Sequence, residues 1–104
     1  MNVIEHLLVC LVEECAELQH HVSKSIRFGL DDHNPRADSP TNCEEIVNEL
    51  NDLFAIVELL QKQGALPSVV IDPDKIRKKQ EKVRLFMQYA KSQGTLKADS
   101  PVDL

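Results

Sequence analysis

Three long stretches of the chain repeat apolar residues at intervals of three and four, and this spacing constrains the fold more than any other feature. Such intervals gather side chains on one face of an α-helix, whereas strands alternate every second residue. The stretches run from about residue 3 to 27, from about 42 to 63 and from about 73 to 93. The stripe expected to be buried comprises Ile4, Leu8, Leu11, Cys15, Leu18, Val22 and Ile26 in the first stretch, and Ile46, Leu50, Leu53, Val57 and Leu60 in the second. The sequence therefore predicts an all-α chain.

The boundaries of these helices carry start and stop signals. Each stretch is followed by a glycine, which readily takes the positive φ found at helix C-termini. These glycines are Gly29, Gly64 and Gly94. Thr41, with Glu44 three residues later, has the form of a capping box, and Asp72 before Pro73 is a favoured helix start. Residues 30–42 read as a polar loop, of a length that is usually functional or mobile, and residues 65–71 as a linker with room for a short fourth helix.

The chain length points to one domain. With 104 residues, we expect a domain over residues 1–94 and a polar C-terminal tail over residues 95–104. A helical domain of this size has a modest core and often gains stability by association. We therefore expect an antiparallel bundle of three long helices that is completed by oligomerisation.

Charge and cysteine content indicate which partners and which cellular compartment to expect. The net charge of −5 argues against binding nucleic acid through bulk charge. The three cysteines, Cys10, Cys15 and Cys43, are odd in number and form no C-x-x-C pair, so a disulfide framework is not expected. No apolar run reaches the ~18–20 residues that span a bilayer, and the N-terminus lacks the features of a signal peptide. We expect a cytoplasmic protein without a membrane partner.

Two acidic motifs provide the main clue to chemistry. Residues 13–17 read E-E-x-x-E, and residues 49–52 read E-x-x-D. Glu14 and Glu17 share one helix face, as do Glu49 and Asp52, because residues three or four apart are neighbours on a helix. An antiparallel hairpin brings both acidic segments to its loop end, where the carboxylates would repel without a cation between them. Oxygen ligands of this kind suit a hard divalent ion such as Mg²⁺ or Mn²⁺.

E-E-x-x-E on one helix followed by E-x-x-D on the next resembles the MazG-like all-α nucleoside triphosphate pyrophosphohydrolases, of the small bacterial and phage type. The resemblance covers roughly residues 5–92 and includes residues 23–32, which look like the link after the first motif. Residues 48–53, N-E-L-N-D-L, are similar to the E-L-G-D-L of the family, with Asn51 where glycine is common. The spacing between the two motifs is longer than is usual in the family.

The resemblance implies a Mg²⁺-dependent hydrolase that cleaves between the α and β phosphates of a nucleoside triphosphate. The products would be a nucleoside monophosphate and pyrophosphate, which fits housekeeping of the nucleotide pool. The metal ligands that it implies are Glu14, Glu17, Glu49 and Asp52. Glu13 or Glu45 could accept the proton of the attacking water. Phosphates also need positive side chains around them, and the candidates are Lys24, Arg27, Lys78 and Lys82. Phe28, at the loop entrance, is a candidate to stack on the base.

Two other functions remain open at the level of sequence. The step from Glu17 to His20 has the Glu-x-x-His form of a di-iron carboxylate bundle, although His20 lies off the line of Glu14 and Glu17 while His21 lies on it. A small acidic helical hairpin could instead be a non-enzymatic adaptor or antitoxin-like module that pairs with a helix of a partner. Residues 1–104 contain only three glycines and no glycine-rich phosphate loop.

Overall fold

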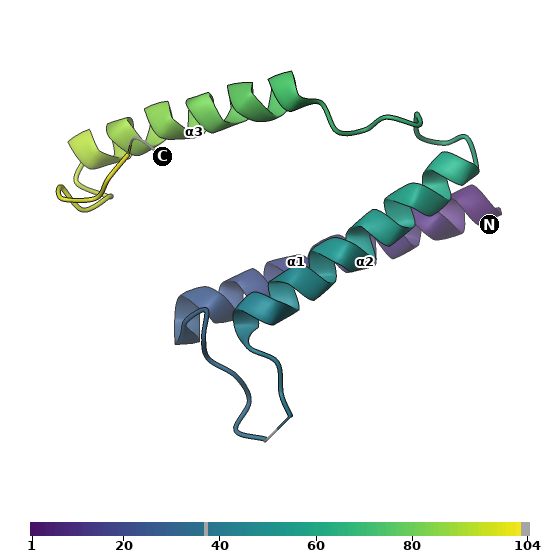
Figure 1. The fold of residues 1–104 in the computed structure, drawn as a ribbon, viewed down its shortest axis with the longest axis horizontal. Coiled ribbons are helices and arrows are strands. Elements are labelled where there is room, and N and C mark those ends of the chain that lie inside the picture. Colours follow the sequence, from purple (N-terminus) through teal and green to yellow (C-terminus); the bar gives the residue numbers. More distant parts are fainter. Residues whose placement is uncertain (37, 103–104) are drawn as a thin grey trace. The chain divides into compact units, whose positions relative to one another are not determined.

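The computed structural model describes residues 1–36 and 38–102, and it is helical as predicted. The three helices are α1 (Val3–Phe28), α2 (Asn42–Lys62) and α3 (Pro73–Ser92) (Figure 1). The described residues contain no strand, only an isolated bridge between His33 and Thr41. None of the described helices is long and apolar enough to cross a membrane. The chain divides into two compact units, one ending at Ser68 and one beginning at Val69, which are described separately.

The first unit is a hairpin whose two helices begin at side-chain caps. The carboxamide oxygen of Asn2 accepts the N–H of Glu5 at 2.8 Å, and the Glu5 carboxylate accepts the N–H of Asn2 at 3.0 Å. This reciprocal pair is a full capping box at the start of α1. At α2, the Thr41 hydroxyl accepts the N–H of Glu44 at 3.1 Å, so the predicted helix start is confirmed. Both caps satisfy backbone donors that have no partner inside the helix.

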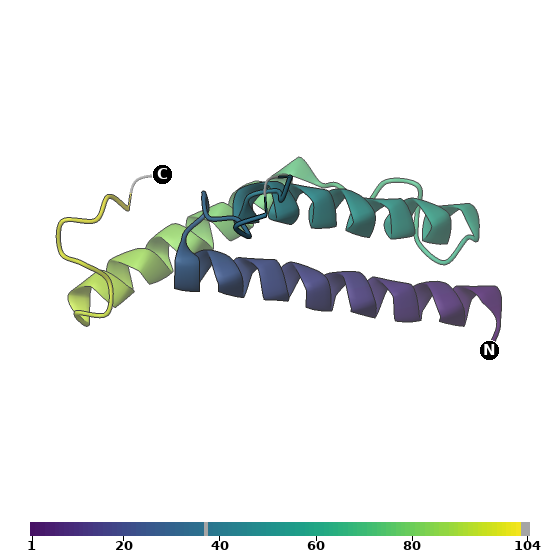
Figure 2. The ribbon, with the colours of Figure 1, turned by 90° about the horizontal axis from the view of Figure 1, so that it is seen from below.

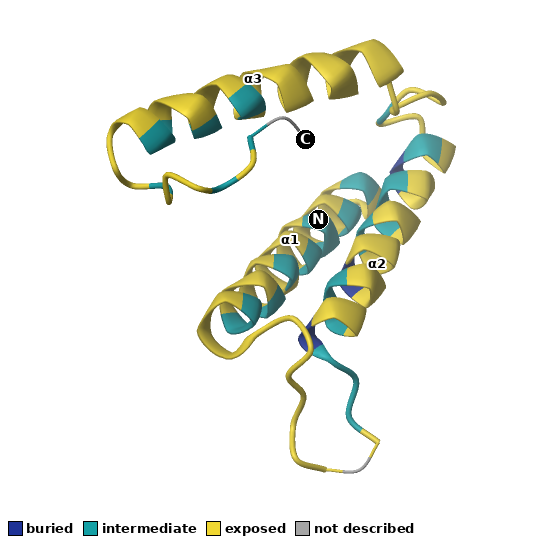
Figure 3. Cartoon of the chain, turned by 60° about the vertical axis from the view of Figure 1, so that its left-hand side comes forward, coloured by how far each residue is buried: buried dark blue, intermediate teal, exposed yellow. Residues whose placement is uncertain are grey.

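Helices α1 and α2 pack antiparallel along one seam (Figures 1 and 2). Buried and half-buried residues follow this seam at alternating steps of three and four, the spacing of a left-handed helix pair. On α1 they include Ile4, Leu7, Leu11, Glu14, Leu18, His21 and Ser25, and on α2 they include Ile46, Glu49, Leu53, Ile56 and Leu60 (Figure 3). Leu60 is the only hydrophobic residue that is fully buried among the described residues. The seam thus has an apolar end and an acidic end.

The predicted buried stripe is wrong for part of each helix. Leu8, Cys15, Val22 and Ile26 are exposed on α1, and Leu50 is exposed on α2. The physical reason is that each helix carries apolar residues around more than one face, whereas a hairpin covers only the face that meets its partner. A second apolar stripe therefore remains open on the surface of this unit.

Backbone and side-chain hydrogen bonds close the hairpin at the base of its loop. The Asn42 carboxamide donates to the carbonyl of Gly29 at 2.9 Å, and Asn42 is 3% exposed. The N–H of Asn42 donates to the carbonyl of Asp32, and the N–H of Cys43 to that of Leu30, both at 2.9 Å. Gly29 has a φ of 103°, which a side chain would strain. These bonds hold the end of α1 beside the start of α2.

The second unit contains α3, and its start matches the prediction. The Asp72 carboxylate accepts two backbone N–H groups of the first turn, at 3.0 and 3.2 Å, and Pro73 occupies the first helical position. The helix is followed by Gly94 at a φ of 78°. Beyond it, the N–H of Leu96 donates to the carbonyl of Ala90 at 3.2 Å, so the described start of the polar tail caps the helix. Packing of α3 into a bundle, and its completion by oligomerisation, remain predictions.

Candidate metal centre

The acidic end of the seam brings together oxygen donors from both helices. Glu14 on α1 and Glu49 and Asp52 on α2 each offer one carboxylate oxygen, and these three oxygens lie within 4.8 Å of one another. Glu49 is buried, Glu14 is half-buried and Asp52 is exposed. The group therefore runs from the interior of the seam to its surface, and a bound ion would be open to solvent on the side of Asp52.

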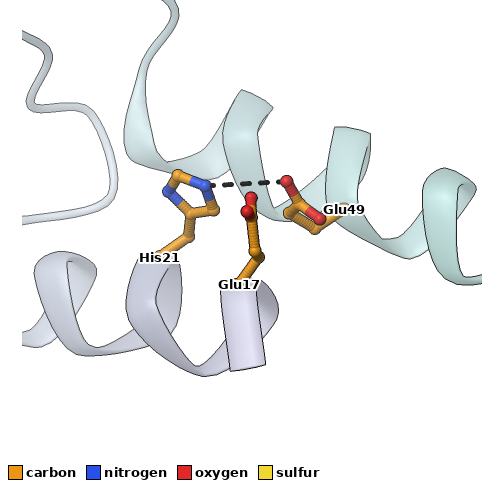
Figure 4. Close-up of side chains that lie close together, drawn as sticks. All are labelled: Glu17, His21 and Glu49. Carbon is orange, nitrogen blue, oxygen red and sulfur yellow. Dashed lines mark ion pairs between the residues drawn. The ribbon is translucent and has the colours of Figure 1, made fainter. Parts of the chain in front are cut away.

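A second group of donors shares Glu49 with the first. Glu17 and His21 on α1 and Glu49 on α2 also offer ligand atoms within 4.8 Å of one another. Figure 4 shows the carboxylate of Glu17 between the ring of His21 and the carboxylate of Glu49 in projection. Glu17 and His21 are four residues apart, so one helix turn separates them and they project from the same face.

Glu49 is the best-buried charged residue of the hairpin, being 6% exposed. Burial and, to a smaller extent, the neighbouring carboxyl groups of Glu14 and Glu17 together raise the pKa of its carboxyl group from 4.5 to about 7. Its Oε2 atom is buried without a hydrogen-bond partner among the described residues. A buried carboxylate is normally paired or metal-bound, so burial of this oxygen is costly unless a cation or a proton binds to it.

His21 is the imidazole that the structure places beside these carboxylates. Its Nε2 lies 3.4 Å from Oε2 of Glu45 and 3.8 Å from Oε1 of Glu49. The His21 side chain is 14% exposed, and its Nδ1 is buried without a hydrogen-bond partner in the described part of the chain. His20 is exposed, and its ring centroid lies 5.5 Å from that of His21. The histidine that meets the acidic residues is therefore His21, not the His20 of the Glu-x-x-His step.

The seam explains why these side chains converge. Glu14 and His21 occupy seam positions on α1 that apolar residues fill in the other half of the helix, and Glu49 does the same on α2. Antiparallel packing then brings the acidic half of one helix against the acidic half of the other. The four residues expected to bind metal all fall within the two donor groups, which share Glu49. His21 was not among the residues predicted to bind metal, although its ring belongs to the second donor group and its place four residues after Glu17 puts both on one helix face.

The two candidate proton acceptors lie in different surroundings. Glu45 is half-buried and faces His21, which in turn lies beside Glu49. Glu13 is exposed and belongs to neither donor group found among the described residues. The geometry therefore places Glu45 next to the candidate centre and leaves Glu13 on the surface of α1.

The candidate phosphate-binding residues are distributed over both units. Lys24 is half-buried on α1, three residues beyond His21. Arg27 is exposed, and its guanidinium lies 4.7 Å from the ring centroid of Phe28, the candidate for base stacking. Lys78 and Lys82 are exposed on α3 in the second unit, and Lys82 Nζ lies 5.7 Å from the ring centroid of Phe86.

Comparisons with protein-family models, with curated proteins and with solved structures find no match to this chain. The chemical interpretation therefore depends on the residues themselves. They offer a buried carboxylate shared by two donor groups, one made of oxygens alone and one that includes an imidazole nitrogen. The first group suits a hard divalent cation, and such a cation in turn binds phosphate oxygens.

Proposed function

We propose that this protein is a Mg²⁺-dependent nucleoside triphosphate pyrophosphohydrolase of the MazG-like all-α type. The observation that carries the proposal is the oxygen group of Glu14, Glu49 and Asp52, with the buried and unpartnered Oε2 of Glu49 at its inner end. The order of the two acidic motifs on successive antiparallel helices supports it as well. The reaction releases a nucleoside monophosphate and pyrophosphate by cleavage between the α and β phosphates. Mn²⁺ is a plausible substitute, since it takes similar ligands.

The residues fit a Mg²⁺ ion in number and chemistry. Mg²⁺ binds oxygens at ~2.0–2.1 Å in octahedral geometry, so two of its ligands lie at most ~4.2 Å apart. Donor oxygens within 4.8 Å of one another reach such an arrangement with small side-chain rotations. Glu17, whose carboxylate lies in the second donor group beside Glu49, completes the expected set of four acidic ligands. When bound, Mg²⁺ neutralises phosphate charge and lowers the pKa of a coordinated water.

The other residues of the site have separate roles in this proposal. Glu45 accepts the proton of the attacking water, and the 3.4 Å contact with His21 holds its carboxylate beside the metal site. Glu13 is the second candidate for this proton. Lys24 and Arg27 bind phosphate oxygens from the end of α1 that carries the acidic motif.

Lys78 and Lys82 on α3 are further candidates to bind the phosphates, from the same chain or from a second copy. The substrate is a nucleoside triphosphate, and neither nucleic acid nor a membrane is a partner. A cytoplasmic location accords with three free cysteines and with a nucleotide substrate.

The proposed oligomer, a homodimer or homotetramer, is supported by the open apolar stripe of the hairpin. A core in which Leu60 is the one fully buried hydrophobic residue of the described chain is small for an independent fold. Val22 is 40% exposed on α1, and Val47 and Phe54 are 51% and 49% exposed on α2. A second copy that covers these residues would turn the two-helix hairpin into a four-helix bundle.

The same exposed residues favour one alternative, an adaptor or antitoxin-like module that binds a helix of another protein. The two functions differ in what they require of Glu49. An adaptor needs the apolar surface and tolerates replacement of the buried carboxylate, whereas the hydrolase loses its metal ligand and its activity.

The experiment that tests the proposal is a panel of ribo- and deoxynucleoside triphosphates incubated with Mg²⁺ and assayed for pyrophosphate and orthophosphate. We expect pyrophosphate from the wild-type chain, at least a hundredfold less from E49Q, and wild-type activity from E58Q. Glu58 is an exposed residue of α2 outside both donor groups, which makes it a matched control. Orthophosphate without pyrophosphate would contradict the bond assignment, and full activity of E49Q would contradict the site.

A further inference from the structure

The imidazole of His21 is separated from the carboxylate of Glu49 by a distance that suits a shared ion better than a direct hydrogen bond. Its Nε2 lies 3.4 Å from Glu45 and 3.8 Å from Glu49. Charge-assisted hydrogen bonds between nitrogen and oxygen are shorter, ~2.7–2.9 Å. Two ligands at ~2.0–2.2 Å from one ion lie ~3.4 Å apart at tetrahedral angles and up to ~4.2 Å apart on opposite sides. The 3.8 Å contact between His21 and Glu49 falls in this second range.

We propose that the acidic end of the hairpin has a second cation position, bound by Glu17, His21 and Glu49. The ligand atoms of the first three lie within 4.8 Å of one another (Figure 4). This position takes a transition ion such as Co²⁺, Zn²⁺, Fe²⁺ or Mn²⁺ rather than Mg²⁺. The reason is the imidazole nitrogen, a ligand that suits the transition metals, whereas Mg²⁺ prefers oxygen alone.

The two oxygens of Glu49 allow it to bridge the two cation positions. Oε1 faces Nε2 of His21 at 3.8 Å, whereas Oε2 is buried without a partner among the described residues. Glu49 is 6% exposed, so this oxygen is held away from water and remains available to a ligand. Oε1 therefore binds the ion held by Glu17 and His21, and Oε2 binds the ion held by Glu14 and Asp52. Paired ions that share a carboxylate typically lie ~3.5–4 Å apart.

This inference shares Glu49 with the proposed hydrolase site but requires no nucleotide, so the two can fail separately. The test is calorimetric titration of the nucleotide-free protein with Co²⁺ in excess Mg²⁺, together with the visible absorption spectrum of the bound Co²⁺. We expect one Co²⁺ per chain that Mg²⁺ does not displace. We expect H21Q to weaken this binding by at least tenfold and to change the absorption bands, because the nitrogen ligand is lost.

H20Q is the matched control, since His20 is the exposed neighbour of His21 and lies outside both donor groups. We expect H20Q to bind Co²⁺ like the wild-type chain. E17Q provides a second variant at an exposed position, where folding is not at risk, and it too should weaken the binding. The inference is overturned if H21Q and E17Q bind Co²⁺ as tightly as the wild-type chain, or if H20Q is weakened as much as H21Q. The first result would make His21 a simple counter-ion of Glu45 and Glu49, and the second would indicate adventitious binding at surface histidines.

Discussion

Replacement of Glu49 by glutamine should stabilise the metal-free protein at neutral and alkaline pH, even though it removes a residue of the candidate site. The glutamine side chain has the shape of the protonated carboxyl group and cannot ionise. The wild-type residue, in contrast, must lose a proton at high pH while it is 6% exposed and beside Glu14 and Glu17. The folded state therefore resists an ionisation that the unfolded state permits.

The magnitude and sign follow from the pKa of Glu49. Burial and the neighbouring carboxylates raise the pKa from 4.5 to about 7, and each pKa unit corresponds to about 1.4 kcal/mol. The upper limit of the effect is thus about 3–4 kcal/mol. Between pH 4.5 and 7 the folded chain holds a proton that the unfolded chain has released. The free energy of unfolding of the wild-type chain therefore falls as the pH rises through this window and levels off above it.

The assay is thermal or urea unfolding followed by circular dichroism, in chelator, at one protein concentration and at several values between pH 4 and 8. We expect E49Q and wild type to unfold alike at pH 4. At pH 8 we expect E49Q to melt higher, by on the order of 10 °C for a domain of this size. E58Q should follow the wild-type curve at every pH, because Glu58 is exposed.

Divalent metal should reverse the order of the two proteins. A ligand that binds only the folded state stabilises it, so Mg²⁺ or Mn²⁺ should raise the melting temperature of the wild-type chain and leave E49Q unchanged. The reasoning is refuted if metal-free E49Q is less stable than wild type at pH 8, or if the difference between them does not vary with pH.

Three further predictions concern the hairpin and its metal. L60A should lose about 2–5 kcal/mol of unfolding free energy, since Leu60 is 0% exposed, whereas L59A, at a 43% exposed position, should lose far less in the same urea titration. N42A should lose about 1–2 kcal/mol, because the carbonyl of Gly29 loses the 2.9 Å hydrogen bond from the Asn42 carboxamide; an unfolding curve like that of the wild type would contradict this. F54K should convert an oligomer to monomers in light scattering if the open apolar stripe binds a second copy, and an unchanged mass would place the interface elsewhere.

The helical part of the fold could be predicted from sequence because its signals are local. Each of these signals determines the conformation of only a few neighbouring residues. They are the spacing of three and four, the caps at Thr41 and Asp72, and the glycines after each helix. The rotation of the seam could not be predicted in the same way. Leu8 and Leu7 are equally apolar, and the choice between them depends on which face the other helix covers. That choice is a property of the pair of helices rather than of either one.

The candidate site was predictable where it depends on position along the helices, and not where it depends on their rotation. Glu14, Glu49 and Asp52 were expected to meet because their heights along an antiparallel hairpin match, and the structure brings their oxygens together. The part played by His21 depends on the rotation of α1, since only a seam position aims its ring at Glu45 and Glu49. The spacing favoured His21 over His20, because His21 lies on the line of Glu14 and Glu17, but it did not identify Glu45 and Glu49 as the neighbours of His21.

The hydrogen bond between Gly29 and Asn42 lies between the loop and the candidate metal centre. Asn42 lies about one helix turn from Glu45 and about two turns from Glu49. Its bond to Gly29 therefore fixes the alignment of α1 with α2 at the base of the loop. That segment can lengthen, shorten or change its composition without moving the carboxylates. The sequence of this segment can therefore change independently of the site, and an engineer could insert a tag or a reporter in it.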